Sequence, residues 1–75
     1  MDKKVAALLN EQINKELYSA YLYLDMANFY ASKGLDGFAN WFEVQAREER
    51  DHAMLIYKYL HNNSQDVTLE AIAKP

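Results

Sequence analysis

Ser32-Lys33-Gly34-Leu35-Asp36-Gly37 is the stretch that decides the fold, because it holds both glycines of this 75-residue chain. A lysine followed by glycine is a typical helix end, since the cation suits the last turn and glycine adopts the left-handed backbone that closes it. Asp36 is expected to cap the next helix. Residues 3–33 and 36–62 are therefore predicted to form two long helices. Their short connection predicts an all-α antiparallel two-helix hairpin.

The composition excludes several classes of protein. Hydrophobic residues make up 51% and charged residues 25%, which excludes a disordered chain. The chain has no cysteine, so disulfides, zinc ribbons and thiol catalysis are excluded. A formal charge of -3 is too acidic for a general nucleic-acid binder. No apolar run approaches the roughly 18 residues of a membrane span. The first residues lack the apolar segment of a signal peptide, so we expect a cytoplasmic protein.

Both predicted helices carry broad apolar faces of the kind that suits a four-helix bundle. Two helices cannot enclose such faces, because a hairpin leaves one side of its seam open. We therefore expect a second copy of the chain, or a missing second half, to cover that side. The positions are Leu9, Ile13, Glu16, Ala20, Tyr23, Ala27 and Tyr30, then Phe38, Phe42, Gln45, Glu49, His52, Ile56 and Tyr59, with a neighbouring stripe of Leu17, Leu24, Ala39, Ala46, Ala53 and Leu60.

Three ionisable residues, Glu16, Glu49 and His52, interrupt these apolar faces. Burying an ionised carboxylate costs several kcal/mol unless a cation, a proton or a metal ion compensates it. Counted from the bend at a rise of about 1.5 Å per residue, Glu16 is level with the turn that holds Glu49 and His52. Glu49 and His52 are three residues apart and share one helical face. We expect the three groups to converge, with the Tyr23 hydroxyl close enough to approach them.

This arrangement has two interpretations. One glutamate from one helix and a Glu-x-x-His motif from its neighbour make half of a carboxylate-bridged dinuclear metal site. Carboxylates with one imidazole per metal suit iron or manganese better than structural zinc. The alternative is a polar network that fixes the register of a helical bundle.

Two segments resemble the first half of a prokaryotic non-haem ferritin: residues 9–23 (LNEQINKELYSAYLY) and residues 46–53 (AREERDHA). The resemblance implies that Glu16, Glu49 and His52 bind the first iron of a di-iron ferroxidase centre, with Glu49 bridging to the second iron. Tyr23 resembles a tyrosine that hydrogen-bonds a ligand carboxylate and supplies an electron. Glu48 matches an acidic position at a third iron site.

The implied function is iron storage. Fe(II) is oxidised by dioxygen at the di-iron site, and ferric oxyhydroxide is deposited in a hollow homo-oligomeric shell of subunits. Residues 1–62 would be the two-helix half of the bundle, and residues 63–75 the start of the long crossover loop. The third, fourth and fifth helices of the family are absent, so we interpret the chain as a fragment. Two such chains could rebuild a bundle by symmetry, with His52 from each.

Other classes remain open. A rubrerythrin-like peroxidase typically adds a cysteine-ligated iron domain, and this chain has no cysteine. An encapsulated ferritin also uses two-helix subunits, and only the wording of the motifs argues against it. The third alternative is a metal-free helical hairpin that acts as a dimerisation module.

Overall fold

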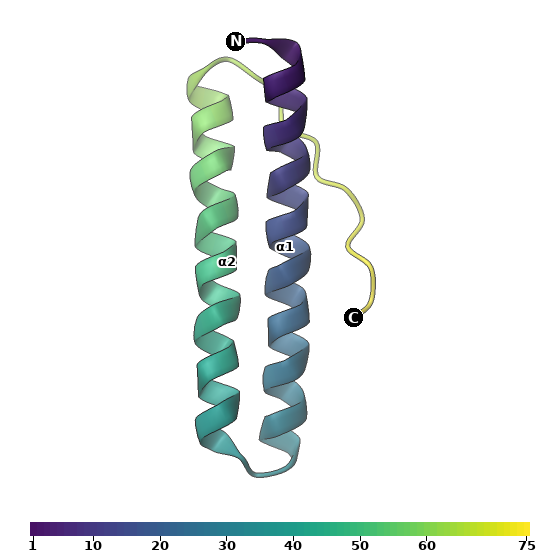
Figure 1. The fold of residues 1–75 in the computed structure, drawn as a ribbon, viewed down its shortest axis with the longest axis vertical. Helices are drawn as coiled ribbons and strands as arrows, with labels where there is room; N and C mark the ends of the chain where they lie inside the picture. Colours follow the sequence, from purple (N-terminus) through teal and green to yellow (C-terminus); the bar gives the residue numbers. More distant parts are fainter.

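The bend between the two helices is closed by backbone hydrogen bonds at a left-handed glycine. The computed structural model describes residues 1–75, which form α1 (Lys3–Ser32) and α2 (Asp36–Asn62) with no strand. Gly34 has a φ of 71°. The Gly34 N–H donates to the Ala31 carbonyl (3.0 Å) and the Leu35 N–H to the Tyr30 carbonyl (2.9 Å), the pattern of a Schellman turn. The predicted antiparallel hairpin is confirmed (Figure 1).

The helix caps differ from the prediction at one end. Leu35, not Asp36, is the N-cap of α2, and no side chain caps this helix. The Schellman turn ends on Leu35, so Leu35 takes the capping position and α2 begins at Asp36. Asp36 still places a negative charge in the first turn, where the helix dipole favours it. At the start of α1, the Asp2 carboxylate accepts hydrogen bonds from the backbone N–H groups of Lys4 and Val5.

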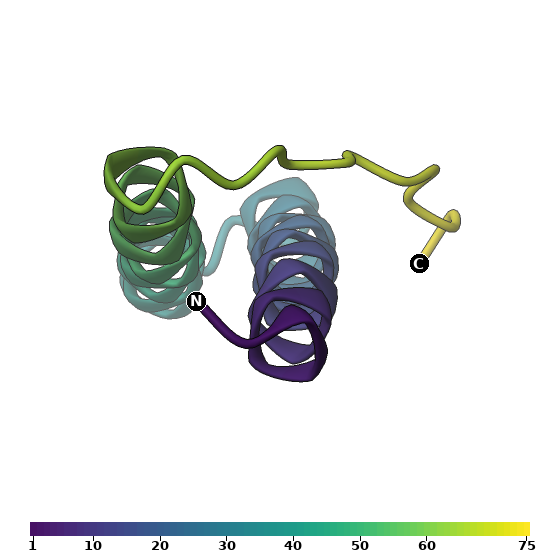
Figure 2. The same cartoon turned by 90° about the horizontal axis from the view of Figure 1, so that it is seen from above.

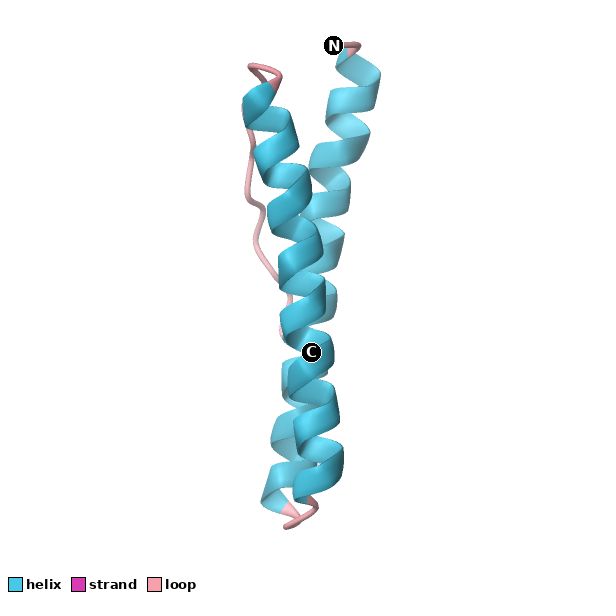
Figure 3. Cartoon of the chain, turned by 90° about the vertical axis from the view of Figure 1, so that its left-hand side faces the viewer, coloured by secondary structure: helices cyan, strands magenta, loops and turns pink.

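The two helices meet along a narrow seam of mostly small residues. The buried residues are Ile13 and Ala27 on α1, and Ala39, Ala53 and Leu60 on α2. Short side chains let helix axes approach closely. The α2 members all belong to the neighbouring stripe of the sequence pattern, whereas Phe38 and Tyr59 of the main series are exposed. Seen edge-on, the helices cross near the bend and separate toward the N-terminus (Figure 3).

The segment after α2 is extended, and it is held against α1. It leaves the end of α2, passes across α1 and runs back toward the bend (Figures 1 and 2). The Asn10 side chain exchanges two hydrogen bonds with the backbone of Thr68, at 2.8 and 3.1 Å. The Asn14 side chain donates to the Thr68 carbonyl (3.0 Å) and accepts from the Glu70 N–H (2.8 Å). Two asparagines one turn apart therefore hold this segment in place.

The molecule is long and thin, with principal extents of 48 × 20 × 13 Å. Its radius of gyration is 14.6 Å, against about 11 Å for a compact domain of this length. Only five of the 75 residues are buried. Neither helix has a stretch long and apolar enough to cross a membrane. The hairpin therefore leaves many of its large apolar side chains exposed.

Candidate metal centre

The structure brings Glu16, Glu49 and His52 together midway along the hairpin. The His52 Nδ1 atom lies 3.8 Å from a Glu16 carboxylate oxygen and 3.9 Å from a Glu49 carboxylate oxygen. One ligand atom from each residue lies within 4.8 Å of the others. The glutamate side chains are 18% and 22% exposed, and the His52 side chain is 55% exposed. The three donors therefore converge on one point at the edge of the seam.

The two carboxyl groups share a hydrogen bond that separates their acidities. That bond holds the pKa of Glu16 below its usual value, and donation from Gln12 and the nearby His52 act in the same direction against partial burial. The same bond raises the pKa of Glu49, and burial and the negative charges of Glu16 and Glu48 raise it further. Glu49 is thus the weaker acid of the pair and Glu16 the stronger. A cation that binds both groups competes with protons for their carboxylate oxygens.

Gln12 is a site residue that the sequence reasoning missed. Its side-chain amide donates to a Glu16 oxygen at 3.0 Å, one turn along α1. The spacing of four residues could have indicated this contact, because residues four apart on a helix are neighbours. Such a donor orients a carboxylate and leaves its other oxygen free for a cation.

Tyr23 and Glu48 lie outside this group. The Tyr23 ring stacks on Phe42 with ring centroids 6.1 Å apart, and its hydroxyl makes no hydrogen bond to the three donors. Glu48 is exposed, and its charge reaches the site only through its effect on the pKa of Glu49. Neither residue's role in iron chemistry follows from this geometry, and both roles stay predictions.

Oxygen and imidazole donors on a pair of antiparallel helices define a class of protein. One glutamate on the first helix and Glu-x-x-His on the second form half of the donor set of the di-metal carboxylate bundles. Residues 6–75 match the family model described as the ferritin-like domain. The chain belongs to that family.

The relatives show which part of a ferritin the chain resembles. It is 39% identical to a bacterial non-heme ferritin of Staphylococcus epidermidis and spans 45% of that protein's length. Against the bacterial non-heme ferritin of Campylobacter jejuni the identity is 41%, again over 45% of the relative. Both matches cover the whole of this chain. The chain corresponds to the first half of these proteins, as the sequence motifs predict.

The solved structures agree on the fold. The open-pore ferritin from the hyperthermophilic archaeon Archaeoglobus fulgidus superposes with a TM-score of 0.95 at 45% identity, covering 100% of this chain and 46% of that one. An engineered closed form of the same ferritin gives the same TM-score. The hairpin is therefore half of a ferritin-type four-helix bundle.

Proposed function

We propose that this chain supplies half of a di-iron centre that oxidises Fe(II) with dioxygen for iron storage. The observation that carries the proposal is the convergence of Glu16, Glu49 and His52 to within 4.8 Å. Carboxylate oxygens are hard, anionic donors, and such donors with an imidazole suit iron. The naming of the relatives as non-heme ferritins supports the same conclusion.

Each residue has a role in this proposal. Glu16 and His52 bind one iron, and Glu49 bridges to the second, as the resemblance to the ferritin centre implies. Two ferrous ions each give one electron to dioxygen. Tyr23, two turns from Glu16 on α1, is the proposed auxiliary electron donor. Glu48, one residue from Glu49, is the proposed acidic ligand of a third iron.

The rest of the assembly follows the ferritin pattern. Residues 1–62 are the iron-binding helix pair, and residues 63–75 are the start of a crossover segment. The full family architecture implies a cytoplasmic homo-oligomeric shell that holds ferric oxyhydroxide. The chain spans 45% of the curated relatives' length, so the remaining ligands of the second iron must come from further helices or from another chain.

Replacing Glu49 by alanine tests the proposal. We expect the initial rate of Fe(II) oxidation in air to fall at least about tenfold, because the bridging ligand is lost. The rate is measured from the growth of Fe(III) absorbance. Glu43→Ala is the matched control, since Glu43 is an exposed glutamate of the same helix outside the donor group. Equal rates in the unsubstituted chain and the Glu49→Ala variant would contradict the assignment.

A metal-free helical dimerisation module is the second candidate. The exposure of Phe38, Trp41 and Tyr59 favours it, because such side chains are typical of interaction surfaces. A titration with Fe(II) under nitrogen separates the two candidates. Bound iron at His52 raises the thermal midpoint in the first case and leaves it unchanged in the second.

A further inference from the structure

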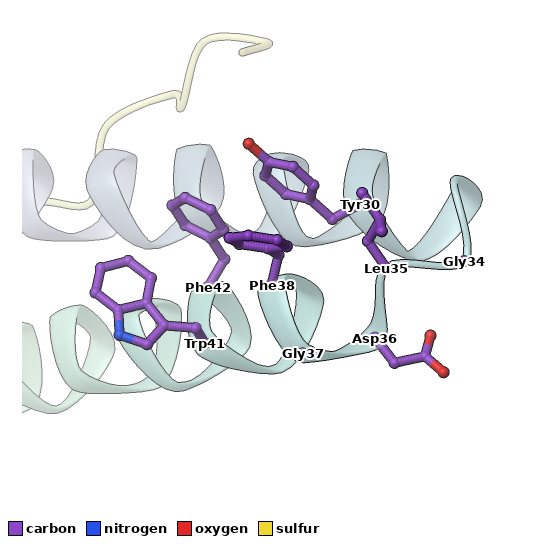
Figure 4. A pocket seen from close by; sticks show the side chains of 8 residues that line it. All are labelled: Tyr30, Gly34, Leu35, Asp36, Gly37, Phe38, Trp41 and Phe42. Atoms are coloured by element: carbon purple, nitrogen blue, oxygen red, sulfur yellow. The ribbon is translucent and has the colours of Figure 1, made fainter.

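The two ends of the hairpin are held together in different ways. At the bend, the turn at Gly34 joins the helices, and aromatic rings pack across them. The Tyr30 ring of α1 stacks on the Phe38 and Phe42 rings of α2, at centroid distances of 5.3 and 5.5 Å. These rings gather next to the bend (Figure 4). At the other end no loop joins the helices, and they separate toward the N-terminus (Figure 3).

Apolar packing sets the distance between the helices at this separated end. The donor group of Glu16, Glu49 and His52 links α1 to α2 at one level. Outside that group, no ion pair or side-chain hydrogen bond joins the two helices. The separation of the helices beyond the donor group therefore depends on the side chains that fill the seam.

Val67 of the tail is one of those side chains. The buried cluster at this end consists of Ile13, Ala53 and Leu60, which are 0–1% exposed. Val67 is half-buried and packs against this cluster, and it is the only residue of the tail that does so. A residue that follows both helices in the sequence thus completes the packing between them.

Backbone hydrogen bonds fasten the tail on both sides of Val67. Two residues before it, the Gln65 N–H donates to the Leu60 carbonyl at 2.9 Å. One residue after it, Thr68 exchanges two hydrogen bonds with the Asn10 side chain. Because only backbone atoms of the tail take part in these bonds, they fix the position of Val67 without depending on its neighbours' side chains.

The tail and the donor group lie on opposite sides of the same stretch of seam. A helix turns about 100° per residue, which places Ile13 roughly 60° and Asn10 roughly 120° around α1 from Glu16, in the same direction. Ile13 is also one turn from Glu16 along the helix, and Ala53 directly follows His52. The cluster that Val67 completes therefore lies between the tail and the donors.

We propose that Val67 is a positioning residue, which braces the seam from the side opposite the donor group and so sets how closely Glu16 and His52 approach. This inference rests on the metal ligands of the proposed function. Zinc holds oxygen and nitrogen ligands at about 2.0–2.2 Å, so a small change in helix separation weakens its binding. Since coupling between two sites is reciprocal, an ion bound at the donor group also tightens the tail.

Zinc binding to the full chain at neutral pH tests the brace. Zinc is not oxidised, so the result is independent of iron oxidation. Val67→Ala should raise the zinc Kd at least about fivefold, measured by competition with a chromophoric chelator. Asn10→Ala should act in the same direction, because it loosens Thr68 and leaves the cluster intact. In the unsubstituted chain, bound zinc should slow amide hydrogen exchange at Thr68.

Two control variants separate positioning from a general loss of stability. Leu69→Ala removes an apolar side chain of the same tail that is 63% exposed, and it should leave the zinc Kd unchanged. Ala27→Gly weakens α1 at a buried position near the bend, far from the tail, and it should also leave the Kd unchanged. Circular dichroism at the titration temperature should show that every variant is folded.

Equal zinc Kd values in Val67→Ala and the unsubstituted chain would overturn the proposal. Exchange at Thr68 that ignores zinc, or a Kd raised as much by Ala27→Gly, would overturn it as well. So would equal binding of zinc to His52→Gln, because the ion would then lie elsewhere. A brace confirmed with zinc in a chain that does not oxidise Fe(II) would refute only the proposed function. Oxidation of Fe(II) in a chain whose zinc Kd ignores Val67→Ala would refute only the brace.

Discussion

Glu16 and Glu49 are chemically identical side chains that the hairpin makes unequal. The hydrogen bond between them favours a proton on Glu49 and a charge on Glu16. A cation bound to both groups would offset the repulsion between them at a pH where both are ionised.

The stability of the metal-free chain should therefore depend on pH in a defined direction. The pKa of Glu49 is raised above its usual value of 4.5, so its contribution is complete below that value and is lost as the pH rises through the raised pKa. We expect the free energy of unfolding to fall over that range, by less than about 1 kcal/mol because the groups are partly solvated. Urea denaturation with a chelator present measures it.

Glu49→Gln should flatten this part of the profile, since glutamine does not titrate. Glu16 adds a slope of the other sign: its lowered pKa gives stability that is present above 4.5 and lost as the pH falls through the lowered value. An unchanged slope above pH 4.5 in Glu49→Gln would show that other carboxylates set the profile.

At the scale of elements, the C-terminal end of each helix is closed by a backbone turn at a left-handed residue. Ser64 takes a left-handed φ of 58° after α2, and the Gln65 N–H donates to the Leu60 carbonyl, repeating the turn that Gly34 makes after α1. After this second turn the chain reverses along α1, where Asn10 and Asn14 hold it. The tail is thus positioned by side chains of the opposite helix.

Replacing Asn14 by alanine should release the tail. Asn10 and Asn14 together make four side-chain hydrogen bonds to the backbone of Thr68 and Glu70. The substitution removes the two that Asn14 makes, and each is worth about 1 kcal/mol. We expect faster amide hydrogen exchange at Glu70, with α1 and α2 protected as before. Asn40→Ala is the control, because Asn40 is an exposed helix asparagine with no such contact. Unchanged exchange at Glu70 would show that the Asn10 contacts hold the tail without Asn14.

The secondary-structure elements show which parts of the fold the sequence predicts. The two helices and the bend at Gly34 followed from glycine placement and helix-forming composition, because those signals are local. The asparagine contacts to Thr68 and Glu70 could not be predicted, since they join residues more than fifty positions apart. The position of Glu16 at the same height as His52 was predictable only because a tight bend fixes the register of two regular helices.

At the scale of the whole molecule, the pattern of apolar residues predicted more burial than the hairpin provides. Phe38 and Tyr59 belong to the predicted apolar face yet remain exposed, while alanines of the neighbouring stripe fill the seam. The pattern of apolar residues includes every helix face that is buried in a complete four-helix bundle. Two helices packed against each other can bury only one of these faces. The predicted apolar residues that stay exposed therefore lie on the surface that the other helices of a four-helix bundle would cover.

The alanine seam sets the distance across which opposing carboxylates must reach. Ala53 is 1% exposed and lies one residue after His52. Enlarging it to leucine should wedge the helices apart and cost about 1–3 kcal/mol of stability. Competition between Zn²⁺ and the larger Mn²⁺ should then shift toward manganese, whereas Ala31→Leu at an exposed site should leave the preference unchanged. The Ala53 methyl group would thus select the size of the bound ion without touching it. Metal preference could then change in a descendant chain while every proposed ligand stays the same.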